Sequence, residues 1–196
     1  MRAFLNTALR VALAAMAVGA APAAVGAAAE SAPLQAIERL DVPRYMGTWH
    51  EIAKYPNWFQ RRCVGDTSAR YTLQPDGVVQ VLNRCRREDG SFDEALGVAR
   101  QTGGPDSPRL QVRFAPAWLS FVPLVWGDYW VIDLDADYQL VAVSEPQREY
   151  LWILSRTPRI DAARYDALVP RLLRQGFDPS RLQRTPASVA DSSGLR

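Results

Sequence analysis

The feature that most limits the fold is a succession of eight short strand-like stretches separated by turn residues. Pro75-Asp76-Gly77 and Asp89-Gly90 are tight-turn sequences, and the stretch 110–114 alternates apolar and polar side chains. Alternating stretches joined by tight turns predict an antiparallel meander. The expected strands cover residues 49–55, 68–73, 78–84, 93–101, 110–114, 129–134, 139–144 and 150–156.

A flat meander exposes two unpaired edges, and closure into a barrel removes them. After Pro158 the pattern becomes helical: Asp161 is placed to cap a helix that ends near Gln175, before Gly176. The apolar face of this helix carries Tyr165, Leu168, Val169 and Leu172. We therefore predict an all-β fold, an eight-stranded antiparallel up-and-down β-barrel with a C-terminal α-helix packed outside. Such a barrel is just wide enough for side chains or one small ligand.

The N-terminus has the pattern of a signal peptide. Arg2 and Arg10 flank a positively charged start, a short apolar run covers residues 11–18, and Ala27-Ala28-Ala29 forms an A-x-A cleavage site. The run is shorter than the roughly 20 apolar residues of a membrane span, although an uncleaved anchor is the alternative. We expect a signal peptide over residues 1–29, one domain over residues 30–185 and a disordered tail over residues 186–196.

Charge and motifs exclude several functions. Cleavage removes two of the 23 basic residues, which leaves 21 basic and 21 acidic residues and no net charge. This balance predicts no nucleic-acid partner, because such partners usually require a basic surface. The chain has one histidine and no G-x-S-x-G, H-E-x-x-H, P-loop or C-x-x-C motif. We expect no enzymatic activity, no metal and no cofactor.

The two cysteines, Cys63 and Cys85, predict a disulfide. In an exported chain, a pair of cysteines most simply forms one bridge. A bridge that closes a loop of about 20 residues contributes about 3 kcal/mol to stability in the chain-entropy treatment. The alternatives are a metal site or a reactive thiol, but two distant cysteines without a nearby histidine are poor zinc ligands.

Three motifs, in order, resemble the signatures of the lipocalin family. Gly47-Thr48-Trp49 precedes the first strand, residues 127–135 lie between the sixth and seventh strands, and Arg156 ends the eighth. Residues 49–53, 81–84 and 150–158 look like the bacterial, apolipoprotein-D-like branch, and the resemblance covers about residues 40–184. It implies a periplasmic carrier that stores or transports a fatty acid or lysophospholipid, its small hydrophobic partner.

The sequence departs from that branch in two places. Many of its members are lipoproteins with a cysteine soon after the signal peptide's apolar run, whereas residues 1–62 contain no cysteine, so we expect no lipid anchor. The aromatic residue that usually follows the signature tryptophan is replaced by His50. No role is carried over to that position, and alternation predicts that His50 faces away from the interior.

The resemblance implies that Trp49 and Arg156 form a structural floor pair, with the guanidinium across the indole. Alternation then directs Glu51 and Ala53 of the first strand and Trp152 of the eighth strand inward. The fourth strand carries three small residues on one face, Ala95, Gly97 and Ala99. If they face inward, which we favour, they leave space inside the barrel; if they face outward, they allow the helix to pack closely. The expected ligand-binding set is mostly apolar and consists of Glu51, Ala53, Tyr71, Val81, Asn83, Ala95, Gly97, Ala99, Leu110, Val112, Phe114 and Trp152.

Several alternatives stay open at this point. Either face of the sixth strand is suited to line the interior. The barrel is expected to be hollow and to hold a ligand, and the alternative is a solid core with no ligand. The apolar stretch 118–126 is either a lip that contacts a membrane or a partner, or a loop folded over the core. The competing functions are an isomerase with a cavity cysteine and an interaction module that docks through residues 118–126. The sequence does not decide whether the protein is a monomer or a homodimer.

Overall fold

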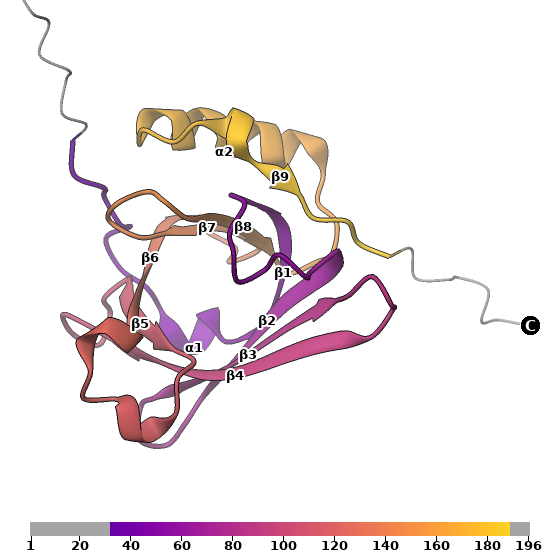
Figure 1. Cartoon of the computed structure of the whole chain (residues 1–196). Helices are drawn as coiled ribbons and strands as arrows, with labels where there is room; N and C mark the ends of the chain where they lie inside the picture. The colour runs from indigo at the N-terminus through magenta and orange to yellow at the C-terminus, as the bar shows by residue number, and fades with distance from the viewer. Residues whose placement is uncertain (1–31, 189–196) are drawn as a thin grey trace, which may run out of the picture. The chain divides into compact units, whose positions relative to one another are not determined.

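Eight antiparallel strands form one closed sheet in the computed structural model, which describes residues 32–188 (Figure 1). Consecutive strands are paired, and β1 also pairs with β8, which closes the barrel. This confirms the predicted fold class. The strands are β1 Gly47–Lys54, β2 Gly65–Leu73, β3 Val79–Arg86, β4 Phe92–Gln101, β5 Arg109–Arg113, β6 Gly127–Leu134, β7 Leu140–Ser144 and β8 Leu151–Ser155.

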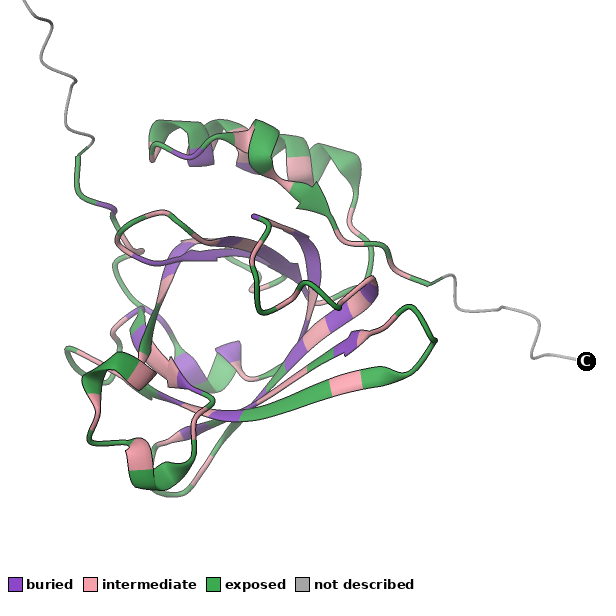
Figure 2. Cartoon of the chain, in the orientation of Figure 1, coloured by how far each residue is buried: buried purple, intermediate pink, exposed green. Residues whose placement is uncertain are grey.

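The predicted C-terminal helix is α2, Ala162–Arg174, and it packs on the outside of the barrel. The Asp161 side chain accepts a hydrogen bond from the Ala163 amide, as expected of an N-cap. Leu168 and Leu172 are fully buried, whereas the opposite face of the helix is exposed (Figure 2). Arg171 also pairs with Asp133 of β6 at 2.6 Å. None of the helices within residues 32–188 is long and apolar enough to cross a membrane.

The sheet separates two apolar clusters. The inner cluster lies on the inner face of the barrel and includes Trp49, Val131 and Val143. The outer cluster lies between the sheet and α2 and includes Ile132 and Ile153. The open question about the sixth strand is therefore answered: Tyr129 and Val131 face inward, and Trp130 and Ile132 face the helix side.

The short elements were not predicted. They are α1 Val42–Tyr45, η1 Ala117–Leu119, η2 Pro123–Val125, η3 Pro179–Arg181 and β9 Gln183–Arg184. Each is four residues or fewer, too short for a hydrophobic period to be visible in the sequence. The helix α1 lies within the barrel outline in Figure 1. The strand β9 pairs with β1 at Ala53 and Lys54, beyond the last residue of β1 that pairs with β2.

The C-terminal segment continues along the barrel after β9. The Asp66 amide donates to the Pro186 carbonyl at 2.8 Å, and the Ser188 amide and hydroxyl donate to the Asp66 carboxylate. The described chain thus extends three residues into the expected tail. Residues 189–196 and the expected signal peptide over residues 1–29 lie outside the described residues.

Candidate ligand-binding barrel

One end of the barrel, here called the floor, is closed by Trp49 and Arg156. The Arg156 guanidinium lies 3.9 Å from the centre of the Trp49 ring, and Trp49 is fully buried. Arg156 donates hydrogen bonds to the backbone carbonyls of Arg44, Tyr45, Thr48 and Tyr138. The indole of Trp49 donates to the Tyr45 carbonyl at 2.9 Å. These bonds attach α1 and the ends of β1 and β8 to one another.

The other end, here called the mouth, is open to solvent along the inner face. Inward residues near the floor, such as Val79 and Ala99, are buried. Their neighbours nearer the mouth are more accessible: Asn83 and Val112 are half-buried, and Ala95 is exposed. Since the pairing of Asn83 with Ala95 places both on the inner face, the barrel is reached from this end. The mouth carries the loops 55–64, 87–91, 114–126 and 145–150.

Most of the expected ligand-binding set lies on this inner face. Members of the inner apolar cluster, or packed against it, are Tyr71, Val81, Ala99, Leu110, Val112 and Trp152. Strand pairing places three more on the same face, namely Asn83, Ala95 and Gly97. The small residues of β4 thus face the interior and not the helix. Glu51 also faces inward, because it pairs with the inward Leu154.

The inward orientation expected for Ala53 is wrong. The register between β1 and β8 shifts between Glu51 and Ala53, so that one extra residue of β1 interrupts the alternation. Ala53 therefore joins the outer cluster against α2, with Ile153 as its partner. The same shift turns Lys54 inward, opposite Trp152.

The space over Gly97 is not free for a ligand, contrary to the expectation that this row of small residues hollows the barrel there. A Cβ at position 97 would lie 2.7 Å from the Arg113 carbonyl oxygen and 2.7 Å from the ring of Phe114. The ring of Phe114 thus covers Gly97. Phe114 itself is 44% exposed at the mouth. Because Gly97 has no side chain, β5 can lie close to it.

A cluster of three tyrosines inside the barrel was not identified from the sequence as a unit. The Tyr129 hydroxyl lies 2.8 Å from the Tyr45 hydroxyl and 3.1 Å from that of Tyr71. Burial raises the pKa of Tyr71 to about 12, and it raises the pKa values of Tyr45 and Tyr129 well above the usual value. All three hydroxyls are therefore protonated across the physiological range.

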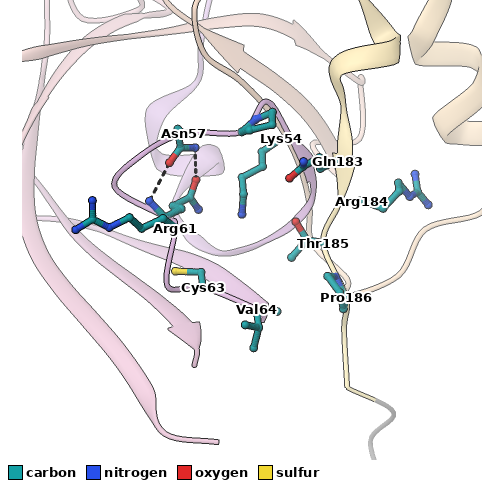
Figure 3. Close-up of a pocket in the computed structure, with 12 residues that line it drawn as sticks. Lys54, Asn57, Arg61, Cys63, Val64, Gln183, Arg184, Thr185 and Pro186 are labelled. Carbon is teal, nitrogen blue, oxygen red and sulfur yellow. Dashed lines mark hydrogen bonds between the residues drawn. The ribbon is translucent and has the colours of Figure 1, made fainter. Parts of the chain in front are cut away.

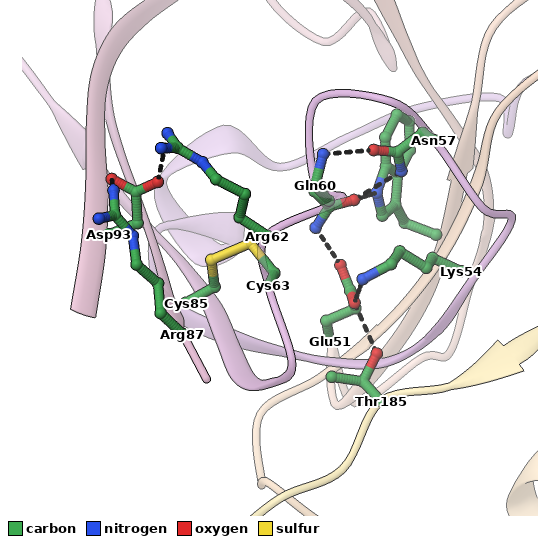
Figure 4. Close-up of a disulfide and its surroundings, with 11 residues drawn as sticks. Glu51, Lys54, Asn57, Gln60, Arg62, Cys63, Cys85, Arg87, Asp93 and Thr185 are labelled. Carbon is green, nitrogen blue, oxygen red and sulfur yellow. Dashed lines mark hydrogen bonds and ion pairs between the residues drawn. A yellow bond between two sulfur atoms is a disulfide. The ribbon is translucent and has the colours of Figure 1, made fainter. Parts of the chain in front are cut away.

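A polar network occupies the inner side of the mouth (Figure 4). The buried carboxylate of Glu51 accepts hydrogen bonds from Lys54 at 2.8 Å, Gln60 at 2.7 Å and Thr185 at 2.5 Å. The Gln60 side-chain oxygen accepts from Asn57 at 2.6 Å and from the Trp152 indole at 3.1 Å. Glu51 was expected to bind the ligand, and its hydrogen-bond partners in the structure are these neighbouring side chains.

The predicted disulfide between Cys63 and Cys85 is confirmed (Figure 4). It attaches the loop 55–64 to the mouth end of β3, and both cysteines of the sequence are used in it. A thiol nucleophile, which the isomerase alternative requires, is therefore not available from either cysteine. Among residues 32–188, no group of three or more His, Cys, Asp or Glu side chains is arranged to hold a metal ion.

A pocket of about 320 Å³ lies beside the mouth, where β1 and β2 separate (Figure 3). Its walls are the end of β1, the loop 55–64, the start of β2 and residues 183–186. It is lined by polar side chains such as Lys54, Asn57 and Thr185, and by none of the residues expected to bind the ligand. This pocket is a separate feature from the apolar inner face.

The apolar loop, residues 118–126, is a lip at the mouth and is not folded over the core. Trp118, Phe121 and Leu124 are 71%, 79% and 94% exposed. Trp126 is held against the barrel, where the guanidinium of Arg100 lies 4.1 Å from the centre of its ring. The loop 55–64 adds Trp58, which is 71% exposed, at the same end of the barrel.

Known proteins resemble this chain along most of its length. The family described as "Lipocalin-like domain" matches residues 40–187. Temperature-induced lipocalin-1 of Arabidopsis thaliana is 41% identical over 161 residues, covering 81% of this chain and 86% of the relative. Outer membrane lipoprotein Blc of Escherichia coli K12 is 37% identical over 170 residues, covering 84% and 92%. Insecticyanin from Manduca sexta has a similar fold, with a TM-score of 0.63 at 18% identity over 80% of this chain and 86% of its own.

Proposed function

This chain belongs to the lipocalin family, and on that premise we propose that it is a periplasmic carrier that holds one fatty acid or lysophospholipid in its barrel. Lipocalin barrels enclose a single small ligand, which supports a binding role rather than a catalytic one. The proposed physiological role is the storage or transport of membrane lipids.

The observation that carries the proposal is the inner face, which is apolar, sealed at the floor and accessible at the mouth. Val81, Leu110 and Val112 contribute aliphatic side chains to this inner face. Burial of an acyl chain contributes about 25 cal/mol per Å² of apolar area. Part of this energy is offset by the ordering of the chain and the loss of its free motion. The binding is therefore driven by apolar area and is reversible.

The proposed location is the periplasm, with the signal peptide cleaved after Ala29 and no lipid anchor. The similarity to Blc, which is named as an outer membrane lipoprotein, supports a place in the cell envelope. Edman sequencing of the protein recovered from an osmotic-shock fraction should begin at Glu30. Recovery only in the membrane fraction, with residues 1–29 still attached, would contradict this location.

The exposed apolar loop favours a transient contact between the mouth and a membrane surface during ligand exchange. Tryptophan and other apolar side chains at the loop tips are suited to the membrane interface. A homodimer through the same side chains is the competing proposal. Flotation with phosphatidylglycerol–phosphatidylethanolamine vesicles, compared with sedimentation equilibrium of the free protein, separates the two.

Two adjacent substitutions on opposite faces of β4 test the carrier function. Ala95 faces the open interior and Leu96 faces outward with 62% of its surface exposed, so a tryptophan fits at either position without entering a packed core. Ala95→Trp should weaken palmitic acid binding at least tenfold, because the indole enters the ligand's path. Leu96→Trp should bind as the wild type does. Equal binding by both variants, or no lipid extracted from the native wild-type protein, would contradict a ligand in the barrel.

A further inference from the structure

The three inward tyrosines have one more hydroxyl proton than the hydrogen bonds among them require. The hydroxyls of Tyr45, Tyr71 and Tyr129 carry three protons, and the two hydrogen bonds that link them require two. Within residues 32–188, these three hydroxyls form no other hydrogen bond with the protein. A buried donor without an acceptor is costly, so the remaining proton favours an acceptor supplied by another molecule.

The cluster lies on the inner side of the barrel. Tyr45 and Tyr71 are 2% and 8% exposed and belong to α1 and β2, whereas Tyr129 of β6 is only half-buried. Tyr129 pairs with the inward Leu110, so its side chain faces the same interior as the apolar wall. A ligand that enters along that wall approaches the Tyr129 side chain.

A positive charge without a carboxylate partner lies next to this cluster. All hydrogen bonds of the Arg156 guanidinium go to neutral backbone carbonyls, and no carboxylate in the described part of the chain forms an ion pair with it. It lies 3.9 Å from the Trp49 ring, which in turn lies 5.0 Å from the ring of Tyr45. The floor therefore favours a negatively charged group over a neutral one.

The inward Lys54 and Glu51 at the mouth form a neutral pair, whereas Asp93 is paired with both Arg62 and Arg87. The Lys54 ammonium lies 2.8 Å from the Glu51 carboxylate, whose side chain is 2% exposed. Two further donors, Gln60 and Thr185, complete the hydrogen bonding of that carboxylate. The Glu51–Lys54 pair therefore provides no net attraction for an anion.

We propose that the hydroxyl cluster of Tyr45, Tyr71 and Tyr129 is the binding site for the carboxylate of a fatty acid, which enters the barrel carboxylate first and leaves its methyl end at the mouth. This inference rests on the proposed carrier function. A single hydroxyl donor suits a compact carboxylate, and a bulky phosphodiester headgroup requires more donors and more room. The site thus selects fatty acids over lysophospholipids.

The first experiment removes the central hydroxyl and compares two ligands. Tyr129→Phe should weaken palmitic acid binding about tenfold or more, while methyl palmitate, which carries no charge, should lose less. The ratio of the two affinities therefore falls, and a general loss of folding does not change a ratio in this way. The matched control is Tyr150→Phe at the mouth, where the ratio should stay at the wild-type value. An unchanged ratio in Tyr129→Phe, or a reduced ratio only in Tyr150→Phe, overturns the proposal.

The second experiment reads the orientation directly. Isotope-filtered NOE spectra are recorded with palmitic acid labelled with ¹³C at carbon 2 or at carbon 16. Carbon-2 protons should show contacts to the Tyr129 ring, and the carbon-16 methyl should show contacts to Trp152 or Phe114. The reverse assignment overturns the proposed orientation but leaves the carrier function intact. Absence of binding to the wild type, by contrast, is a failure of the carrier function itself.

Discussion

The floor and the mouth of this barrel are constructed in opposite ways. At the floor, Trp49 is fully buried beneath Arg156, and backbone carbonyls accept the hydrogen bonds of the guanidinium. At the mouth, Trp58 and Trp118 are each 71% exposed, and a disulfide restrains the loop that carries Trp58. The same residue type thus stabilises the fold at one end and presents apolar surface at the other. We expect stability to depend mainly on the floor and ligand exchange on the mouth.

The largest effect should come from a pair of tryptophan substitutions that compare the two ends. Trp49→Ala should lower the free energy of unfolding by about 3–5 kcal/mol, as is typical for loss of a large buried aromatic side chain. Trp118→Ala should change it by no more than about 0.5 kcal/mol, since the residue is exposed. Urea unfolding followed by circular dichroism measures both values. Similar losses in the two variants would remove the distinction between floor and mouth.

Removal of the disulfide tests how much the mouth contributes. The double variant Cys63→Ser/Cys85→Ser should lose about 3 kcal/mol of stability, because the unfolded chain regains the freedom of the closed loop. Hydrogen exchange should increase in residues 55–64 and remain slow around Trp49. An equal increase at both ends would mean that the bridge holds the whole barrel and not just its mouth.

Two glycines of the sheet provide a matched comparison of close packing. Gly97→Ala should cost about 1–3 kcal/mol, because the new methyl group would meet the Arg113 carbonyl oxygen at 2.7 Å. At Gly127 the nearest atom to such a methyl group is 3.9 Å away, so Gly127→Ala should be neutral within about 0.5 kcal/mol. Thermal unfolding of the two variants checks this order. A stable Gly97→Ala protein would show that β5 has room to move away.

The smallest effect should be the pH dependence of the C-terminal attachment to Asp66. Burial alone would raise the pKa of Asp66, but hydrogen bonds from Ser188 and Arg86 outweigh it and hold the pKa below its usual value. The attachment is therefore fully present above the ordinary aspartate pKa of about 3.9 and is lost as the pH falls through the lower folded value. The protection factor of the Ser188 amide, which is the exchange rate of an unstructured peptide divided by that of this amide at the same pH, should decrease when the pH is below that range.

Asp66→Asn is the control for this dependence. It should lower the protection factor of the Ser188 amide already at pH 7, with no further decrease on acidification. An acid-induced decrease that is the same in the variant and the wild type would assign the effect to another carboxylate.

Much of the inner face could be predicted from the sequence because alternation along a strand is a local property. Once Val81 is placed inward, Asn83 on the same strand must be inward too. Ala95 then also faces inward, because it pairs with Asn83. The argument failed at Ala53, where the register shift on β1 reverses the alternation. No residue type at that point distinguishes a shifted strand from a regular one.

The sequence by itself determined the number and order of the main strands, the external helix, the disulfide and the family signatures, because turn residues, periodicity and motifs are properties of neighbouring residues. Only the tertiary structure decided which side chains meet across the barrel. The hydroxyls of Tyr45, Tyr71 and Tyr129 converge from three elements, and the Phe114 ring covers Gly97. Such contacts depend on strand register and on closure of the sheet, which are set by the packing of the whole barrel and not by any single segment.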